Sequence, residues 1–341
     1  MLHFYSSPYQ LKECWEELYS SSSIYTPFQS YNANECYFRV YAFKGSRRQY
    51  KPLFVYHTDG KEHCIVPLLV HKREKILRNF SSFGPIDYYD FIASNNTEQY
   101  IRLVLREIME YYKDYNIIFE NIPENSILYA LCSSLKQKKE ICVHIHLEKF
   151  HSADEYIQSL SKHQRQNIRT TYNRTLRNYK EIHMEAYGDD NPMPRKIHHL
   201  CTKMYDNRYA YKFLGAKNKL FIFIRTIIRK LQDPLNRIIK LAENNITYVL
   251  FYDDVPVAYL SGFYSKDKSI FYVPRLTCAI DFLTYDPGII LILETIKVLK
   301  NGKVAYLDLT RGDEPYKYAM GGEEHFNYTI IDSTNNIKNV L

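Results

Sequence analysis

Hydrophobic and polar positions in the first half of the chain predict a run of strands followed by a helix. Two strongly apolar segments, 52–58 and 63–71, flank Asp59-Gly60, and an Asp-Gly pair between apolar segments is a strong hairpin signal. From position 97 onward apolar residues recur at helical spacing instead. The elements expected here are strands at 35–43, 52–58, 63–71, 116–122 and 141–147, a helix at 97–112 and a short helix at 126–135.

The second half of the chain repeats this order of elements. It opens with a long helix at 153–179, and after Pro194 and Asn218 two further helices are expected. A meander of three strands comes next, because apolar segments are separated by short polar turns. The remaining expected elements are strands at 181–187, 247–252, 255–264, 269–276, 304–310 and 325–332, a helix at 286–300 and a short helix at 313–320.

The shared order, which is meander, helix, strand, short helix and strand, predicts two α/β units related by duplication. We place them at 1–150 and 151–341. A strand, a crossover helix and a second strand normally form a parallel pair, so each unit should have a mixed sheet. Ligands of open sheets lie at the carboxyl ends of strands where the topology switches. The site is therefore expected where strands 269–276 and 304–310 end and helix 286–300 begins.

Composition narrows the classes of function. The formal net charge of +7 permits an anionic partner without requiring one. The seven cysteines are scattered without a CxxC pair, which favours reduced thiols in the cytoplasm over disulfides or a zinc site. The sequence begins without the apolar core of a signal peptide, and it has no segment of roughly 18 apolar residues that would span a membrane. We expect a cytoplasmic protein with no membrane span, no metal and no DNA partner.

The start of helix 286–300 has the composition of an anion site. Asp286 is a favourable N-cap residue and Pro287 a favourable first helical residue. Gly288 leaves space where backbone N–H groups point out of the helix, and these groups attract anions together with about half a positive charge of helix dipole. A well-capped helix without a ligand is the commoner explanation of the same residues.

Acidic, phenolic and basic side chains gather where strand 304–310 ends. Asp308 lies near the end of the strand, and Glu314, Tyr316 and Lys317 follow it. Removing a proton from an attacking nucleophile requires such groups at a switch point. The alternative is a polar loop and a short capped helix.

The same segment carries a family resemblance. DLTRGDEPYKYAMGG at 308–322 resembles the signature of the CelD-like acetyltransferases, a branch of the GNAT superfamily, whose pattern is close to D-x-x-x-G-x-E-x-Y-K. The likeness covers most of the chain, although the R/Q-x-x-G-x-G/A loop of mainstream GNAT enzymes is missing. Further segments that resemble the family are YDPGIILI at 285–292, VPVAYLSGF at 255–263, VPLLVHKREK at 66–75 and FGPIDYYDF at 83–91.

The resemblance implies two tandem GNAT-like units in the FemAB-like arrangement, of which 1–150 is degenerate and 151–341 is the acyltransferase. GNAT enzymes bind acyl-CoA between two splayed strands, with the pyrophosphate on a helix N-terminus, so acyl-CoA (acetyl-CoA) is the implied donor. The residues implied are Pro287, Gly288, Ile289 and Ile290 for the pyrophosphate, Asp308, Glu314, Tyr316 and Lys317 for catalysis, and Asp87 and Tyr88 for contacts with the acceptor.

The catalytic roles follow from the chemistry of a thioester donor. Asp308 or Glu314 is expected to take the proton of the acceptor, directly or through water, and Tyr316 to protonate the leaving thiolate. Lys317 is expected either to stabilise developing negative charge or to orient a carboxylate. A free lysine has a pKa of about 10.4, so Lys317 is not expected to act as a base unless it is buried.

Helix 153–179 has a basic face that includes Arg165 and Arg169, which are four residues apart. It resembles the basic helix of CelD-like proteins and of Fem-type aminoacyl-tRNA-dependent peptidyltransferases, and it suits phosphates, including the 3′-phosphate of CoA. A solvated basic face is the alternative. Lys162, Arg174, Arg177 and Lys180 complete this face, and the expected apolar stripe opposite it is Ile168, Tyr172, Leu176 and Tyr179.

Three functions therefore remain open. The first is acyl transfer from acyl-CoA to an amine or hydroxyl of a small molecule, namely a sugar or a cell-envelope or polysaccharide precursor. The second is a Fem-type ligase that uses aminoacyl-tRNA and binds tRNA in a salt-dependent way. The third is a non-catalytic binding protein that retains only the fold.

Overall fold

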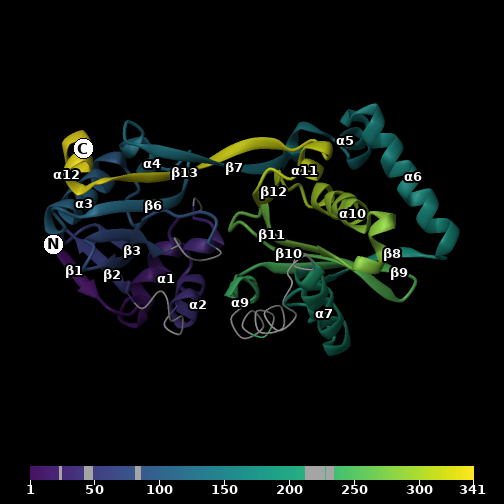
Figure 1. Ribbon diagram of the computed structural model, residues 1–341, viewed down its shortest axis with the longest axis horizontal. Helices are drawn as coiled ribbons and strands as arrows, with labels where there is room; N and C mark the ends of the chain where they lie inside the picture. The colour runs from purple at the N-terminus through teal and green to yellow at the C-terminus, as the bar shows by residue number, and fades with distance from the viewer. Residues whose placement is uncertain (23–24, 42–48, 81–85, 212–226, 228–233) are drawn as a thin grey trace. The chain divides into compact units, whose positions relative to one another are not determined.

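The computed structural model describes residues 1–22, 25–41, 49–80, 86–211, 227 and 234–341 (Figure 1). The chain forms two compact units. The first comprises Met1–Cys142, Pro234–Ala242 and Glu324–Leu341, and the second comprises Val143–Asp233 and Glu243–Glu323. The sequence suggested one division at residue 150, whereas the chain passes from one unit to the other after residues 142, 233, 242 and 323.

The first unit is a mixed sheet with helices packed against it. Its strands follow the order β1-β2-β3-β4-β6-β13-β7, with β5 beside β3, and β4 and β6 form a parallel pair. Its strands are β1 (Leu2–Tyr5), β2 (Lys51–Thr58), β3 (His63–His71), β4 (Ile76–Asn79), β5 (Ile92–Ala93), β6 (Asn116–Pro123), the start of β7 (Gln137–His146) and nearly all of β13 (Glu323–Ser333), and its helices are α1 (Lys12–Ser20), α2 (Tyr31–Tyr41), α3 (Glu98–Tyr111), α4 (Ile127–Cys132), α9 (Pro234–Leu241) and α12 (Thr334–Val340).

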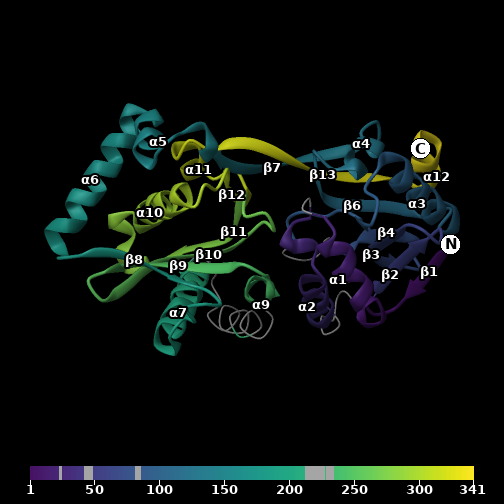
Figure 2. The same ribbon diagram turned by 180° about the vertical axis from the view of Figure 1, so that it is seen from behind.

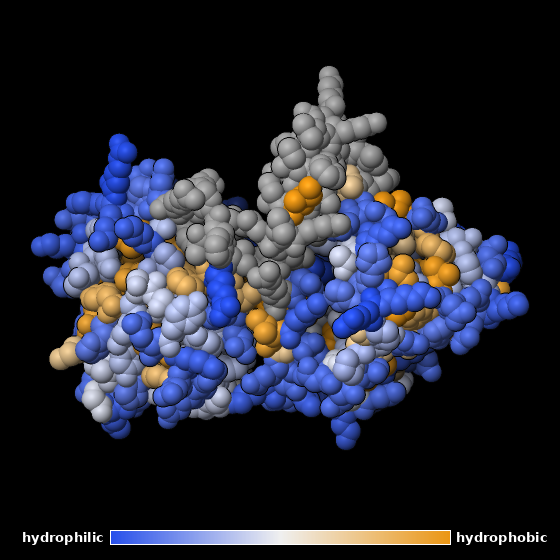
Figure 3. Space-filling view, turned by 90° about the horizontal axis from the view of Figure 1, so that it is seen from below, coloured by the Kyte–Doolittle hydropathy of each residue, from blue (hydrophilic) through white to orange (hydrophobic). Residues whose placement is uncertain are grey.

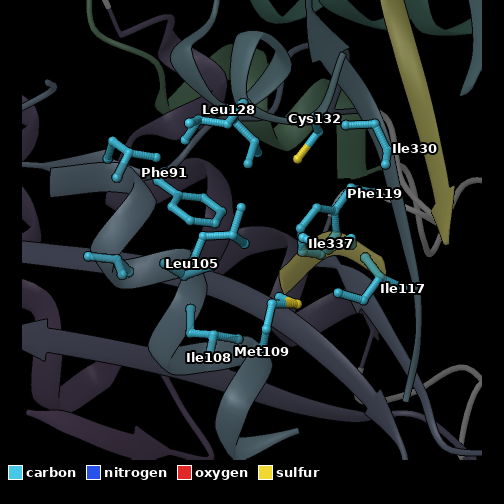
Figure 4. Close-up of a cluster of buried hydrophobic side chains, with 14 of the residues drawn as sticks. Phe91, Leu105, Ile108, Met109, Ile117, Phe119, Leu128, Cys132, Ile330 and Ile337 are labelled. Carbon is cyan, nitrogen blue, oxygen red and sulfur yellow. The ribbon is translucent and has the colours of Figure 1, made fainter. Parts of the chain in front are cut away.

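Helix α3 supplies much of the core of this unit, as its spacing predicts. Thr97 caps the helix, since its side chain accepts a hydrogen bond from the N–H of Tyr100. Leu105 and Ile108 on its buried face point toward Ile117 of β6 in the cluster that Figure 4 shows. One amphipathic face of α3 thus covers the parallel strands of the first unit.

The segment 35–43 was expected to be a strand, and this prediction is wrong for its described part, which belongs to helix α2. Ser30 accepts a hydrogen bond from the N–H of Ala33 at 3.2 Å, in the position of a helix cap. Ala33, Cys36 and Tyr37 are buried at helical spacing. Aromatic residues favour strands only weakly, and burial on one helical face outweighs that preference here.

The second unit is also a mixed sheet, with the strand order β7-β12-β11-β10-β9-β8, and β11 and β12 form a parallel pair. The helix expected after Asn218 lies outside the described residues. Its strands are the end of β7, β8 (Ile182–Tyr187), β9 (Asn245–Tyr252), β10 (Val255–Tyr264), β11 (Ile270–Cys278) and β12 (Tyr306–Arg311), and its helices are α5 (Ala153–Ser159), α6 (Lys162–Asn178), α7 (Arg195–Tyr211), the 3-10 helix η6 (Ile280–Tyr285), α10 (Pro287–Asn301) and α11 (Pro315–Ala319).

Helices cover both faces of this second sheet (Figure 2). On one face Ile290 and Ile292 of α10 join a buried cluster with Leu260 and Phe271 of the sheet. On the other face Met204 of α7 packs in a smaller cluster of sheet side chains. The parallel pair and its crossover helix α10 therefore have the arrangement that the order of elements predicts.

The long helix expected at 153–179 is two helices, because Leu160 is extended and Ser161 begins α6 by accepting a hydrogen bond from the N–H of Gln164. The expected apolar stripe is wrong at Leu176, which is 54% exposed. In the C-terminal half of α6, Thr171 and Thr175 are buried in place of the expected Tyr172 and Leu176. The buried residues of the helix are Gln164, Ile168, Thr171 and Thr175.

Hydrophilic residues cover most of the described surface on the face in Figure 3, and hydrophobic residues are visible there in separate areas. Among the described residues, no helix has the length and apolar character needed to cross a membrane.

Candidate active site

The parallel strands β11 and β12 pair only at their beginning. The registered pairs are Ile270–Tyr306, Phe271–Leu307 and Tyr272–Asp308. β11 then continues to Cys278 and β12 to Arg311, with no further pair between these two fully described strands. The strands therefore diverge beyond Tyr272 and Asp308, and we call this place the fork.

A β-bulge in β11 explains the divergence. Two residues of β11, Val273 and Pro274, face the single residue Gly262 of β10. A bulge bends its strand and increases the local twist, and it accommodates a proline, which has no N–H to donate. The Cβ of any other residue at Gly262 would lie 2.1 Å from the carbonyl oxygen of Tyr272, so the close approach requires glycine. The proline within β11 was the available sequence signal for this bulge.

Helix α10 begins close to the end of β11. Asp286 is the N-cap residue, but its backbone is left-handed, with φ of +44°, and its side chain makes no capping hydrogen bond, contrary to the expectation. Instead its carbonyl oxygen accepts from the N–H of Ile289 at 3.0 Å. Pro287 and Ile290 are buried, whereas Gly288 and Ile289 are half-buried. Of the four residues expected to bind pyrophosphate, only Gly288 and Ile289 reach the surface.

The thiol of Cys278 lies against this helix start. A Cβ built on Gly288 would be 3.0 Å from the Sγ of Cys278. Burial raises the pKa of this thiol to about 11, although Arg208 of α7 and the backbone N–H of Gly288 favour the thiolate. An anion at the start of α10 would therefore share the Gly288 N–H with Cys278, which stays protonated at neutral pH.

Asp308 lies at the fork and is 5% exposed. Its Oδ1 accepts a hydrogen bond of 2.7 Å from the backbone N–H of Thr310. Thr310 has a left-handed backbone, with φ of +55°, and it turns the chain out of β12. The carboxylate is thus held by the chain that directly follows it.

Lys317 is buried, with 2% of its side chain exposed. Its Nζ donates to the carbonyl oxygens of Thr310, Arg311 and Gly312 at 3.2, 2.9 and 3.0 Å, and it forms an ion pair with the carboxylate of Glu314 at 3.0 Å. The three N–H groups of the ammonium therefore have acceptors within the chain. Of the two roles expected for Lys317, this geometry supports orienting a carboxylate rather than stabilising charge on a substrate.

Tyr316 connects the two segments singled out in the sequence. Burial raises the pKa of its phenol well above the usual range, and the nearby Glu314 and Cys278 raise it further. The side chain packs against the same hydrophobic cluster as Cys278 and Ile289. The loop after β12 and the start of α10 thus meet at Tyr316, whose hydroxyl stays protonated at neutral pH.

The cations of α6 fall into two groups. Arg165 donates to the carbonyl oxygens of Gln158 and Leu160, both at 2.6 Å, and Arg174 donates to the carbonyl oxygen of Thr284. These arginines tie α6 to neighbouring backbone, which leaves Arg165 poorly placed for the phosphate role expected from the sequence. Arg169 is exposed, as are Lys162, Arg177 and Lys180, and none of these four has an ion pair among the described residues.

Asp87 and Tyr88, the expected acceptor contacts, lie in the first unit, whereas all the other expected residues lie in the second. Both are buried within an extended segment. The carbonyl oxygen of Asp87 accepts from the buried amide of Asn327 at 2.6 Å, and that of Tyr88 from the amide of Gln29 at 2.7 Å. The ring of Tyr88 stacks on His325.

Sequence reasoning missed Thr310, Cys278 and Arg208. The left-handed backbone of Thr310 has no signature in the sequence, and only the fold brings Arg208 of α7 near Cys278. Among the described residues, no three His, Cys, Asp or Glu side chains are placed to hold a metal ion.

One family model matches a part of the chain that lies mostly in the second unit. Residues 162–318 match the family model of the acetyltransferase (GNAT) domain. The match includes Asp308, Tyr316 and Lys317, the fork and the start of α10. No curated protein matches the chain by sequence.

Solved structures resemble the whole chain in fold. A conserved protein of unknown function from Bacteroides thetaiotaomicron has a TM-score of 0.57 at 10% identity, with 98% of this chain and 100% of that chain covered. The structure named FemX has a TM-score of 0.55 at 10% identity, with 97% and 98% covered. L-PGS from Bacillus licheniformis has a TM-score of 0.52 at 14% identity, with 85% of each chain covered. The expected mixed α/β fold is confirmed, and FemX shares it over nearly the whole chain.

Proposed function

We propose that this protein is a GNAT-type acyltransferase, which transfers an acyl group from acyl-CoA to an amine or hydroxyl group of a small acceptor. The main support for this proposal is the fork between β11 and β12. Parallel strands that diverge at their carboxyl ends expose unpaired backbone groups, and an extended acyl-pantetheine chain with its own amides can pair with them. The buried carboxylate of Asp308 stands at the point of divergence, where the thioester would arrive.

The proposed reaction needs little chemistry from the protein. The nitrogen or oxygen of the acceptor forms a bond to the thioester carbonyl carbon, and the carbon–sulfur bond breaks. The proton of the acceptor passes to a carboxylate, directly or through one water, and the departing thiolate takes a proton from the hydroxyl of Tyr316, which solvent restores. Positioning the acceptor and holding these groups in place supply most of the acceleration.

Asp308 is the better candidate for the base. It is buried at the fork and held by the N–H of Thr310, whereas the side chain of Glu314 is 55% exposed and paired with Lys317. We assign proton removal to Asp308 and treat Glu314 as part of the loop.

The donor and acceptor classes rest on chemical argument. Gly288 and Ile289 would supply backbone N–H groups to the pyrophosphate, Arg208 lies close enough to Cys278 to add positive charge, and exposed Arg169 is a further phosphate candidate. The CelD-like signature around Tyr316 favours a sugar or a cell-envelope or polysaccharide precursor as acceptor. Asp87 and Tyr88, which lie within the expected unit 1–150, are proposed as contacts for the acceptor.

Titration with acetyl-CoA tests this proposal. A ligand that binds only the folded state raises stability by about 2.7 kcal/mol at a hundred times its Kd. We expect a rise in Tm with acetyl-CoA and a smaller rise with dephospho-CoA, because the 3′-phosphate contact is lost. Stabilisation by neither acetyl-CoA nor longer acyl-CoA would refute the donor assignment.

One observation favours a second candidate, the Fem-type ligase that uses aminoacyl-tRNA. The exposed cations of α6 are free to meet phosphates along a nucleic acid. Each phosphate neutralised adds about −0.7 to −0.9 to the slope of log K against log salt, so four contacts predict a slope of about −3. Filter binding of tRNA should show this slope, and Arg169→Ala should reduce it by about one unit while Arg106→Ala on α3 does not.

A further inference from the structure

Thr310 has an unusual backbone for its residue type. Left-handed φ values are found at several positions, and among the described non-glycine residues that adopt them Thr310 alone is β-branched. A side chain branched at Cβ crowds the carbonyl oxygen in this conformation, which makes such a residue a genuine outlier. Strain of this kind persists only where the surroundings hold it in place.

Two side chains hold Thr310 from opposite ends. Its N–H donates to the Oδ1 of Asp308 at 2.7 Å, and its carbonyl oxygen accepts from the Nζ of Lys317 at 3.2 Å. Both partners are almost fully buried. The backbone of Thr310 is therefore held between the carboxylate of Asp308 and the ammonium of Lys317, an arrangement that we call the clamp.

The side chain of Thr310 does not explain the arrangement. It is buried, and its hydroxyl has no hydrogen-bond partner among the described residues, so the backbone makes the polar contacts. Gly312 follows, also left-handed with φ of +111°, and its carbonyl oxygen accepts from Lys317 as well. The ammonium of Lys317 thus holds two left-handed residues of one turn.

We propose that Thr310 is a positioning residue, whose clamped left-handed backbone directs the carboxylate of Asp308 toward the fork, and that Lys317 acts on Asp308 through it. This inference rests on the proposed function, since it assigns Asp308 a base to be directed. The chain of contacts runs from the Nζ of Lys317 to the carbonyl oxygen of Thr310, and from the N–H of Thr310 to Asp308.

A double-mutant cycle between positions 310 and 317 tests the proposal. The readout is release of free CoA from acetyl-CoA with water as the acceptor, which needs the same base. We expect Lys317→Met to lower kcat by about tenfold to a hundredfold, the usual effect of a misplaced catalytic group. In the Thr310→Gly background the loss should be about threefold at most, because glycine keeps the left-handed conformation unaided. Equal losses in both backgrounds would overturn the proposal.

Donor affinity separates positioning from general damage. Neither residue is assigned a contact with CoA, so the Kd for acetyl-CoA should stay within about twofold in all four proteins while kcat changes. Lys317→Arg should recover part of the lost rate, since a guanidinium can still reach carbonyl oxygens. A Kd that rises in step with the fall in kcat would mean that the loop has collapsed, and it would count against positioning.

A second set of variants keeps the proposal falsifiable if Lys317→Met does not fold. Thr310→Gly and Thr310→Asn both tolerate the left-handed region, so each should lose far less of kcat than Thr310→Pro, which cannot adopt a positive φ and lacks the N–H that holds Asp308. A loss of about tenfold in both would show that the side chain of Thr310, and not its backbone, is required.

The stability of the same four proteins distinguishes failure of this inference from failure of the proposed function. Urea midpoints need no substrate, and Lys317→Met should lower the midpoint less in the Thr310→Gly background. If the wild type neither binds nor cleaves acetyl-CoA but the midpoints show this coupling, the clamp stands and the acyltransferase proposal fails. Additive midpoints would refute the clamp itself.

Discussion

The two units differ in how their parallel strands continue beyond the last residue pair. Each has a parallel strand pair joined by a crossover helix, β4 and β6 with α3 in the first and β11 and β12 with α10 in the second. In the first unit the pairing ends at Arg78–Ile118, and the next residue, Asn79, extends it. The amide of Asn79 donates to the carbonyl oxygen of Glu120 at 2.7 Å, and its Oδ1 accepts from the N–H of Glu120 at 2.9 Å.

We call these two hydrogen bonds between Asn79 and Glu120 the bridge. The second unit has a bulge at the corresponding place. Val273 and Pro274 follow the last pair, Tyr272–Asp308, and the strands diverge. A carboxamide reproduces the donor and acceptor of a peptide group, whereas the bulge removes β11 from the reach of β12. The residues that directly follow the last pair therefore make the difference. Asn79 continues the contact between β4 and β6, whereas the bulge at Val273 and Pro274 ends the contact between β11 and β12.

Another segment of the first unit forms hydrogen bonds with β6 next to this parallel pair. The extended segment 86–89 runs beside β6, where Asn121 accepts from the N–H of Tyr89 at 2.8 Å and donates to the carbonyl oxygen of Ile86 at 2.9 Å. The amides of Gln29 and Asn327 hold the next two carbonyl oxygens. In the first unit the chain thus satisfies its own backbone beside the parallel pair, whereas the bulged pair of the second unit is where we propose that the donor binds.

The largest effect is expected at the fork of the second unit. Asp308→Asn removes the base and leaves the shape, so acyl transfer should fall by about 10²–10⁴-fold, the usual contribution of general base catalysis. Steady-state kinetics and calorimetry should show the fall in kcat with little change in the Kd for acetyl-CoA. Asp254→Asn, in the exposed turn between β9 and β10, is the matched control, and equal activity of both variants would exclude Asp308 as the base.

The bulge should be sensitive to a single added methyl group. In Gly262→Ala the Cβ would meet the carbonyl oxygen of Tyr272 at 2.1 Å, so the strands must shift, and we expect a loss of about 1–3 kcal/mol in the free energy of unfolding. Gly302→Ala is the control, because its nearest contact would be 3.5 Å. Urea denaturation measures both, and a similar small effect for the two variants would argue against a tight bulge.

The bridge of the first unit should matter for stability alone. Asn79→Ala leaves the N–H and carbonyl oxygen of Glu120 without these partners, which should cost about 1–3 kcal/mol. The fraction of protein that remains folded should bind acetyl-CoA as the wild type does. A loss of donor binding at unchanged stability would show that the first fork also takes part.

The smallest effect is a pH dependence confined to the first unit. Burial raises the pKa of the Asp90 carboxyl to about 7, against one opposing backbone hydrogen bond from Phe91. In the unfolded chain the carboxyl loses its proton near pH 4, so the folded state is most favoured below that pH and loses stability as pH rises toward 7. We expect Asp90→Asn to remove this loss in urea titrations between pH 4 and 8. Equal slopes for the variant and the wild type would contradict it.

Most of the fold could be predicted from the sequence, since apolar spacing alone locates α3, α10 and the strands of both meanders. The helix α2 could not, because its aromatic residues are equally compatible with a strand and only its packing decides. The path of the chain between the units was also missed, because α9 and β13 carry no local sign of the unit in which they pack.

The candidate site could be predicted at the level of segments. Tyr316 and Ile289 at the start of α10 pack against one hydrophobic cluster, because a topological switch point assembles segments that are distant in sequence, whereas the joint role of Asp308 with them stays a prediction. The roles of individual residues could not be read from it. Lys317 matched a signature, but its burial and its carbonyl partners depend on the left-handed turn at Thr310 and Gly312, which only the fold reveals.

Hydrogen exchange of the wild type with and without acetyl-CoA tests the central claim most directly. If the donor lies between the diverging strands, amides of 273–278 in β11 and of 288–290 at the start of α10 should exchange more slowly when it is bound, while β4 and β6 stay unchanged. Protection that misses both segments, or that appears at β4 and β6 instead, would contradict the account.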